Sequence, residues 1–490
     1  MKADVDFGQF VPDEPSYKNP NLIECNNVLA VSRGYNPIPS LSATATAVTG
    51  EVRGVQRFDL SDGTPFLVVG TDEDLFTIKD GTVAASGLGL ALPFGDFWYF
   101  DQLGKSIYAV CATHGLYRLA DILTDTTFAV NPGSPPLARA LDTVGEFLFL
   151  GNLTDIDASV QPYRVRWSSY NNPTATWDTD SGRQSGYVDM QAKFGEVTAI
   201  VGGNFDLIFQ RNGVSRIWYT GGPTVFAKEV VEDERGCPAP QSIVRVGSAV
   251  YFLAHDGFCK TDGAGVAVIS SDRVWDWFKD ELTSGGLTYV QGAVDWANRS
   301  IVWAFPSQGR PSLTRQIIYN WGLERWTTAS ITLDWVVEST LIPANIDQTD
   351  PEIFDDDNLD AVGPTFDASS SRGRSLSAFV GPTMHEFTGP NLEASFVTGD
   401  YQPTVGSRSF IRSVWPIVRL PARTARASIG GRDTVGEDKI FGPVSAQGSL
   451  GFCPVISDAW YHSVKIEIPA GAFWSQASGF QIDWDGSGSA

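Results

Sequence analysis

Short apolar runs recur along the chain, and each leads through a polar or glycine-bearing turn into a second short strand that carries Leu, Phe or Tyr. The pattern is plain at residues 66–81, where two such strands are followed by a Lys-Asp-Gly turn. Further copies open near residues 106, 146, 206, 249 and 300. The copies lie roughly 40–60 residues apart, and a blade of four antiparallel strands takes roughly 40–50 residues. The spacing therefore predicts a β-propeller, a fold that leaves only short sheet edges.

We predict an all-β protein: a multi-bladed (six or seven) β-propeller with an additional C-terminal β-rich portion. Asn212-Gly213 and Asp256-Gly257 join alternating apolar strands and predict hairpin turns with positive φ. Residues 271–282 place apolar side chains at helical spacing and predict a helix packed on a blade edge. The predicted division is as follows: 1–50, N-terminal arm and first strands; 51–342, main propeller blades; 343–375, acidic insertion loop; 376–400, return to the propeller; 401–490, C-terminal β-rich portion.

Six aromatic residues on the apolar strands are predicted core positions, because strands between neighbouring blades are covered on both faces. They are Trp218, Tyr219, Tyr251, Phe252, Trp303 and Phe305.

The composition is typical of a globular chain, and the negative net charge argues against tight binding of nucleic acid. Hydrophobic residues make up 42% of the 490 residues, and the formal net charge is −22. Tight nucleic-acid binding needs a basic face that neutralises phosphates, although an acidic surface can still let nucleic acid slide past. The chain has no apolar run near the roughly 18–20 residues that span a bilayer. It also starts without the apolar segment of a signal peptide. We expect synthesis in a cytoplasm and no membrane insertion.

Residues that could carry chemistry are scattered. The five cysteines lack a CxxC spacing, and none of the four histidines lies in an HExxH motif. His255 and Cys259 are close in sequence, but a hairpin coincidence explains this better than a catalytic dyad. A GxSxG elbow, a Walker loop and an Asp-box are all missing from the sequence. We therefore predict no enzyme, no cofactor and no metal site, although carboxylates on blade tops keep a glycosidase or sialidase open as an alternative.

Residues 343–375 interrupt the repeat with a stretch rich in Asp, Pro, Ser and Gly. Its acidic cluster consists of Asp355, Asp356, Asp357 and Asp360. A calcium loop would carry Gly at its sixth position and Glu at its twelfth, and this segment carries neither. A loop of this length is usually functional or disordered.

The order of motifs in the middle of the chain resembles a known family. A Gly-Glu-Val-Thr-Ala-Ile-Val-Gly-Gly strand at 195–203 precedes Asp-Leu-Ile-Phe-Gln-Arg-Asn-Gly at 206–213. An Ile-Trp-Tyr-Thr-Gly-Gly-Pro strand follows at 217–223, with later matches at 234–242 and 250–258. This order is similar to the packaged-DNA stabilisation and tail nozzle proteins of short-tailed bacteriophages. The resemblance covers residues 10–330 and, more faintly, 376–480.

The resemblance implies a structural part of a phage tail. The expected partners are further copies of the chain in a homohexameric ring and the tail adaptor or portal-side proteins. Double-stranded DNA would be retained behind the ring and would pass transiently through the shared lumen, and the protein would reside in the virion tail after synthesis in the host cytoplasm. The acidic cluster Asp355, Asp356, Asp357 and Asp360 is then a candidate loop facing the lumen or a neighbour. The alternatives are a propeller enzyme or glycan-binding protein acting on host surface polysaccharide, and a propeller scaffold for protein partners.

Overall fold

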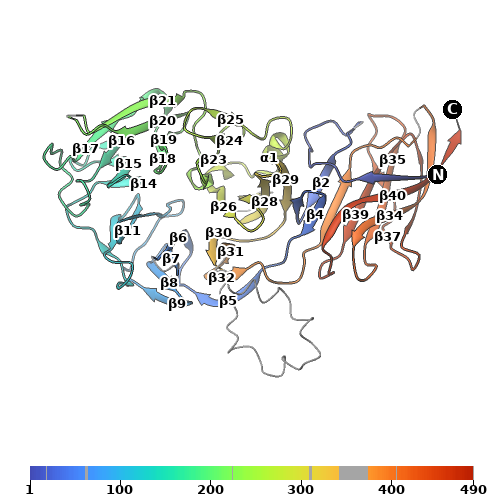
Figure 1. The fold of residues 1–490 in the computed structure, drawn as a ribbon, viewed down its shortest axis with the longest axis horizontal. Coiled ribbons are helices and arrows are strands. Elements are labelled where there is room, and N and C mark those ends of the chain that lie inside the picture. The colour runs from blue at the N-terminus through green and yellow to red at the C-terminus, as the bar shows by residue number, and fades with distance from the viewer. Residues whose placement is uncertain are drawn as a thin grey trace, which may run out of the picture.

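The computed structural model describes residues 1–17, 19–60, 64–222, 224–307, 312–340, 374–403 and 406–488. Figure 1 shows a ring of small sheets on one side and a two-sheet β-sandwich on the other, with both chain ends in the sandwich. Strands supply nearly all the regular structure, which confirms the all-β prediction. The helical pieces of the described residues are α1 (Trp275–Glu281) and three 3₁₀ turns, Ala192–Phe194, Pro240–Ser242 and Gly286–Tyr289.

The ring is a β-propeller of seven antiparallel four-stranded blades within the described ranges. The first three blades are β6 (Val52–Asp59), β7 (Pro65–Thr71), β8 (Leu75–Lys79) and β9 (Thr82–Ala85); β10 (Tyr99–Leu103), β11 (Ser106–Cys111), β12 (Gly115–Leu119) and β13 (Ala129–Val130); and β14 (Leu137–Val144), β15 (Phe147–Thr154), β16 (Val160–Trp167) and β17 (Gly186–Asp189). The next two are β18 (Val197–Val201), β19 (Asp206–Gln210), β20 (Gly213–Tyr219) and β21 (Phe226–Glu232); and β22 (Val244–Val246), β23 (Ala249–Leu253), β24 (Phe258–Thr261) and β25 (Val266–Val268).

The last two blades complete the ring. Blade six is β26 (Gln291–Asp295), β27 (Ser300–Pro306), β28 (Leu313–Asn320) and β29 (Arg325–Ala329), and blade seven is β30 (Trp335–Thr340), β31 (Arg374–Val380), β32 (Thr383–Glu386) and β5 (Ser42–Ala47). Blade seven takes its outer strand from the N-terminal part of the chain. Ala47 of β5 pairs with Thr383, and the Thr44 hydroxyl donates to the Met384 carbonyl over 2.9 Å. This long-range pairing closes the ring.

Apolar clusters lie between each pair of neighbouring blades. The second strand of a blade is buried on both faces, as in β11 and β27, whose residues are all buried. This is why these strands read as continuous apolar runs and not as alternating ones. Val, Ile and aromatic residues fill them because their branched and flat side chains pack well on a pleated surface.

The sandwich combines strands from both ends of the chain. One sheet holds β3 (Val28–Val31), β4 (Gly34–Pro37), β40 (Gln476–Gly488), β34 (Arg408–Arg419) and β38 (Cys453–Ala459), with β1 (Lys2–Asp6) paired to β40. The other extends blade six from β29 through β2 (Leu22–Asn26), β33 (Ala394–Thr398), β39 (Tyr461–Ile468), β35 (Arg426–Arg432) and β36 (Ile440–Phe441), with β37 (Ser445–Ala446) also paired to β35. The first and last strands of the chain are thus hydrogen-bonded to each other.

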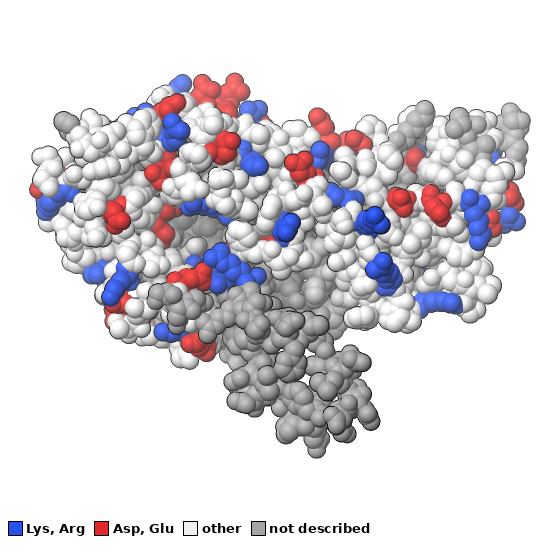
Figure 2. All heavy atoms as spheres, viewed as in Figure 1, with Lys and Arg blue, Asp and Glu red and all other residues white. Residues whose placement is uncertain are grey.

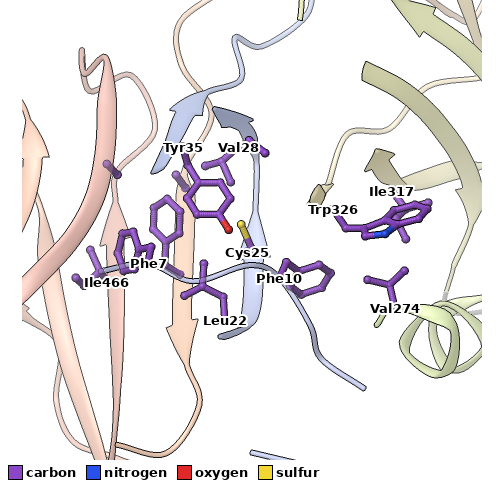
Figure 3. Close-up of a cluster of buried hydrophobic side chains, with 14 of the residues drawn as sticks. Phe7, Phe10, Leu22, Cys25, Val28, Tyr35, Val274, Ile317, Trp326 and Ile466 are labelled. Carbon is purple, nitrogen blue, oxygen red and sulfur yellow. The ribbon is translucent and has the colours of Figure 1, made fainter. Parts of the chain in front are cut away.

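A shared core joins the two domains (Figure 3). Phe7 stacks on Phe396 of the sandwich with ring centroids 4.5 Å apart, while Phe10 meets Trp277 of α1 edge-on at 5.7 Å. Leu22 is fully buried between them. Because this core is continuous from blade five to the sandwich, the propeller and the sandwich pack as one body.

Several details differ from the sequence predictions. The segment 376–400 was expected to return to the propeller throughout, but its last strand, β33, lies in the sandwich. The helix is shorter than 271–282, because the N-terminal arm decides where it starts. The Asp13 carboxylate accepts hydrogen bonds from the backbone N–H of Asp276 and Trp277, both over 2.9 Å. These are donors that a helix leaves unpaired at its first turn.

The predicted core and hairpins were right in part. Tyr251, Phe252, Trp303 and Phe305 are buried, but Trp218 and Tyr219 at the end of β20 are 38% and 48% exposed.

Both predicted hairpins form, but their turns do not use the expected backbone conformation. Gly213 and Gly257 lie outside the positive-φ region. Close packing requires these glycines instead, since a Cβ on Gly257 would lie 2.6 Å from Val268 Cγ1.

Candidate functional site

A cavity, which we call the channel, lies at the centre of the propeller. The first strand of every blade lines a cavity of about 450 Å³. In Figure 2 the propeller is hollowed at its centre, and basic and acidic side chains stand together along the rim of the hollow. This volume is that of a small-molecule pocket. A DNA duplex therefore cannot pass through the propeller itself.

Four charged side chains form a network at the channel mouth. The Arg57 guanidinium lies 2.6 Å from Asp59, and Arg374 lies 2.9 Å from Asp59 and 3.1 Å from Glu338. Two cations and two anions balance each other there, so the mouth has no excess charge from this group. The network also ties blade one to blade seven, because Arg57 donates to the Ser339 carbonyl over 2.6 Å.

The predicted acidic insertion leaves the propeller at this mouth. Thr340, the last residue of β30, pairs with Arg374, the first residue of β31. The predicted boundary at 375 was therefore wrong, because Arg374 and Ser375 already belong to blade seven. Asp355, Asp356, Asp357 and Asp360 themselves lie outside the described residues.

Two neighbouring carboxyl groups face the channel. Burial, followed by the adjacent Asp101 carboxylate, raises the pKa of Asp142 well above its ordinary value. Burial also raises the pKa of Asp101, against the opposing hydrogen bonds from Thr143. Like charges this close cannot both ionise easily, so the pair retains a proton at pH values where an exposed aspartate is ionised.

The cysteines and histidines do not form a reactive group. All five cysteines are buried and free. Burial raises the pKa of Cys259 to about 12, and its thiol donates to the Gly257 carbonyl, so it is not an activated thiolate. His462 is fully buried in the sandwich between the hydroxyls of Ser409 and Ser457, at 2.9 and 3.0 Å. Within the described ranges, no cluster of three His, Cys, Asp or Glu side chains could hold a metal ion.

A second hollow, of about 550 Å³, lies on blades three and four. We call it the tyrosine hollow, and its lining consists of Ser169, Tyr170, Asn172, Gly182, Arg183, Gln184 and Tyr219. Tyr170 is 55% exposed. Sequence reasoning missed this site, because Tyr219 looked like a core residue and Tyr170 stands in a different blade. The Tyr-Asn-Asn turn at 170–172 was the one local signal.

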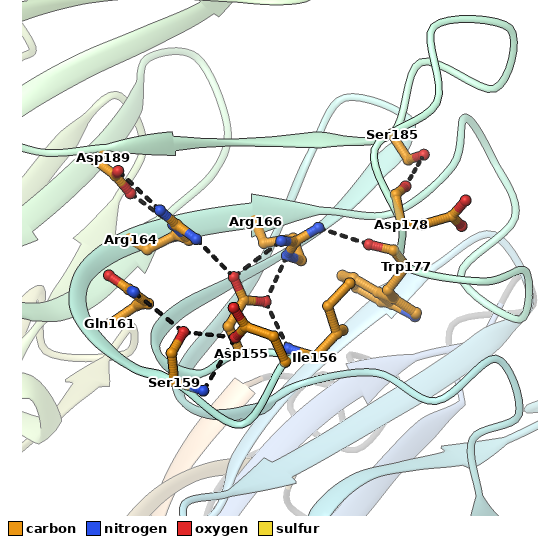
Figure 4. A network of polar contacts seen from close by, with 11 residues as sticks. Asp155, Ile156, Ser159, Gln161, Arg164, Arg166, Trp177, Asp178, Ser185 and Asp189 are labelled. Carbon is orange, nitrogen blue, oxygen red and sulfur yellow. Dashed lines mark hydrogen bonds and ion pairs between the residues drawn. The ribbon is translucent and has the colours of Figure 1, made fainter.

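A network of buried charges in blade three holds the connection that supplies part of this lining (Figure 4). Asp155 accepts hydrogen bonds from Arg164 and Arg166, both over 2.9 Å. Arg166 also donates to the Trp177 carbonyl over 2.7 Å, which holds the long connection between β16 and β17 that carries Arg183 and Gln184. Burial would raise the pKa of Asp155, but these hydrogen bonds outweigh burial and lower it.

The margin of the sandwich carries exposed apolar side chains. We call this the sandwich margin, and it consists of Val435, Ile440, Val444, Leu450 and Ile456, which are 47–81% exposed. These residues belong to one stretch around β36, β37 and β38. Both β36 and β37 pair with β35, and β38 is the last strand of its sheet and packs against β35 and β37. Exposed apolar side chains near a sheet edge are typical of an association site.

Comparisons with known proteins give a distant structural likeness. No model of a known protein family matches the chain, and no curated protein matches it. The crystal structure of BBS1N in complex with ARL6DN is 11% identical, covers 71% of this chain and 96% of that chain, and has a TM-score of 0.39. YCF48 bound to D1 peptide and YCF48 from Cyanidioschyzon merolae are each 11% identical and cover 59% of this chain, with 86% and 88% of those chains and TM-scores of 0.34 and 0.35. The strand pairing itself shows the seven blades.

Among the described residues, no helix combines the length and hydropathy that a bilayer crossing requires.

Proposed function

We propose that this chain is a structural subunit of the tail nozzle of a short-tailed bacteriophage. In this proposal the chain forms a homohexameric ring, contacts the tail adaptor or portal-side proteins, and retains packaged DNA until ejection. The motif order of the sequence motivates the proposal, and the sandwich margin is the structural observation that carries it. Large apolar side chains on a sheet edge lower the free energy of a protein when another chain covers them.

A ring needs two different surfaces on each subunit. A head-to-tail contact closes into a ring when its rotation divides the circle evenly. The sandwich margin supplies one apolar surface, and it lies in the domain that also contains both chain ends. Pairing between β1 and β40 and closure of blade seven by β5 hold both ends of the described chain in sheets. Such closure suits a part that resists internal pressure.

The dimensions of the propeller bear on where DNA would pass. Its own channel is far too small for a duplex, so the lumen in this proposal is the centre of the ring. A net charge of −22 favours a wall that repels phosphates, and charges act across about 8 Å at physiological salt. DNA would then be retained by a mechanical constriction. The insertion carrying Asp355, Asp356, Asp357 and Asp360 is our candidate for a loop that faces the lumen or a neighbour.

The ring proposal is tested by imaging the protein alone and in particles. We expect ring-shaped oligomers of the purified protein, or rings in particles if an adaptor templates assembly. A Leu450→Asp/Ile456→Asp double variant should abolish them. Val160→Asp is the matched control, because Val160 is 74% exposed on the propeller and lies outside the sandwich margin. Particles with a single copy, or with the protein on a peripheral fibre, would contradict the proposal.

The DNA part has its own test. We expect the four-fold Asp→Asn variant of Asp355, Asp356, Asp357 and Asp360 to alter DNA retention or ejection in assembled particles. Unchanged retention and ejection would remove this loop from the mechanism. Tight, salt-sensitive DNA binding by the purified wild-type protein would contradict a repulsive lumen.

The alternative of a polysaccharide-degrading enzyme has a direct test. Turnover of host surface polysaccharide by the purified protein would favour it over the nozzle.

A further inference from the structure

The tyrosine hollow has exposed aromatic rings that the protein holds in place. The Tyr219 hydroxyl and Gln184 Oε1 are 3.1 Å apart. Both Tyr170 and Tyr219 pack on Phe147, with ring centroids 5.4 and 5.8 Å apart. Each ring is therefore supported from behind and open to solvent in front. Rings positioned in this way lose little conformational entropy when a ligand covers them.

The lining of the hollow also contains polar side chains. Asn172 and Gln184 add side-chain amides to the lining, and amides both donate and accept hydrogen bonds.

The charge of the hollow argues against an anionic ligand. Arg183 is the only cation of the lining, and its guanidinium already contacts Asp178 and Asp180, both at 2.9 Å. It also donates to the Thr176 hydroxyl over 2.8 Å. Backbone N–H groups of Gly182 and Arg183 lower the pKa of Asp180, which keeps that carboxylate ionised. Two carboxylates against one guanidinium leave no positive charge to attract a phosphate or an acidic sugar.

Backbone hydrogen bonds hold Gln184 and Tyr170 in place. Gln184 has φ 59°, which is uncommon for a residue with a long side chain. Its carbonyl accepts a hydrogen bond from Trp167 Nε1 over 2.8 Å, and Tyr170 N donates to the Arg183 carbonyl over 3.0 Å.

We propose that the tyrosine hollow binds a neutral saccharide unit. A pyranose ring presents an apolar C–H face, which stacks on the negative face of a tyrosine ring. Its hydroxyls both donate and accept, which matches the side-chain amides of Asn172 and Gln184. The hollow is large enough for one or two sugar units. This binding site goes beyond the nozzle proposal and does not depend on ring formation.

The probes are methyl glycosides of glucose, galactose, mannose, rhamnose and N-acetylglucosamine, with glucuronic acid and N-acetylneuraminic acid as acidic counterparts. Saturation-transfer NMR on the wild-type protein should detect at least one neutral glycoside and neither acid, with a dissociation constant of about 1 mM for a single unit. Absence of transfer from every neutral probe would overturn the proposal, and so would transfer from the acids alone.

Substitutions inside and outside the hollow test whether the saccharide binds there. Tyr170→Ala and Tyr219→Ala should each weaken the affinity about tenfold or more. Tyr163→Ala is the control, because Tyr163 is a 37% exposed tyrosine of blade three outside the hollow, and its affinity should match the wild type. Circular dichroism and thermal melting establish that each variant is folded. Equal binding by folded Tyr170→Ala and Tyr219→Ala proteins would overturn the assignment of the site.

Discussion

Asp155 and Arg166 form a buried ion pair inside blade three. Arg166 Nη2 donates to Asp155 Oδ2 over 2.9 Å, and their side chains are only 4% and 1% exposed, respectively. Arg164 contacts the same carboxylate, so one anion serves two cations. Through the Arg166 bond to the Trp177 carbonyl, the pair links β16 to the connection that carries Arg183.

Loss of the Asp155 charge should strongly destabilise the protein. Asp155→Asn leaves the buried Arg166 guanidinium without its counter-charge, whereas Arg164 keeps Asp189 as a partner. Breaking a buried pair in this way costs about 3–5 kcal/mol. Urea unfolding followed by tryptophan fluorescence measures the free energy of unfolding. The control is Asp157→Asn, an exposed aspartate of the same loop, whose unfolding midpoint should stay near that of the wild type.

Asp155 should also contribute less to stability at acid pH. Because the folded pKa of Asp155 is lowered, its contribution is complete above the ordinary carboxyl pKa of about 4. That contribution is lost as the pH falls through the folded pKa. The gap in unfolding free energy between wild type and Asp155→Asn should therefore narrow below about pH 4. A gap that stays constant down to acid pH would contradict this ion pair.

Asp142 should show the opposite dependence on pH. Its folded pKa is raised, so its favourable contribution is complete below the ordinary carboxyl pKa and is lost as the pH rises through the folded value. Asp142→Asn should therefore stabilise the protein at pH 8, by about 1 kcal/mol or more, and have little effect near pH 4. Thermal melting at both pH values tests this. A variant that is less stable than the wild type at pH 8 would show that the Asp142 carboxylate is favourable there.

Two tryptophans of the blades differ in burial, so their removal should differ in its cost to stability. Trp303 is fully buried and donates to the Ser242 carbonyl over 2.8 Å, whereas Trp218 is 38% exposed. Trp303→Ala should cost about 3–5 kcal/mol, and Trp218→Ala less than about 1 kcal/mol. Chemical unfolding of both variants gives the comparison. Equal costs would contradict the placement of Trp303 between blades.

The five cysteine thiols should be unreactive in the folded protein. Burial raises the pKa of Cys111 and Cys453 to about 11 and that of Cys237 and Cys259 to about 12, and it also raises the pKa of Cys25. Since the thiolate is the reactive form, Ellman's reagent at pH 8 should modify none of the five thiols before unfolding and all of them in guanidinium chloride. A thiol that reacts rapidly in native buffer would contradict its burial.

The candidate sites were only partly within reach of sequence reasoning. The acidic insertion stood out by composition, but Asp355 and its neighbours lie outside the described residues, so its role stays a prediction. The tyrosine hollow could not be found, because Tyr170 and Tyr219 come from different blades and only the fold brings both of them onto Phe147. The Asp101 and Asp142 pair has the same origin, with one carboxyl from blade two and the other from blade three. Proximity between blades leaves no local pattern.

The sequence by itself determined the repeated hairpins and the propeller architecture. Runs such as 106–111 and 300–305 are apolar throughout because both faces of the strand are covered, and that pattern is local. The tertiary structure alone decided that β5 closes blade seven, that β1 pairs with β40 and that β33 leaves the propeller for the sandwich. Those pairings join segments hundreds of residues apart through backbone hydrogen bonds. Any residue except proline can both donate and accept such bonds. They were therefore settled by which edges the folded domains left open.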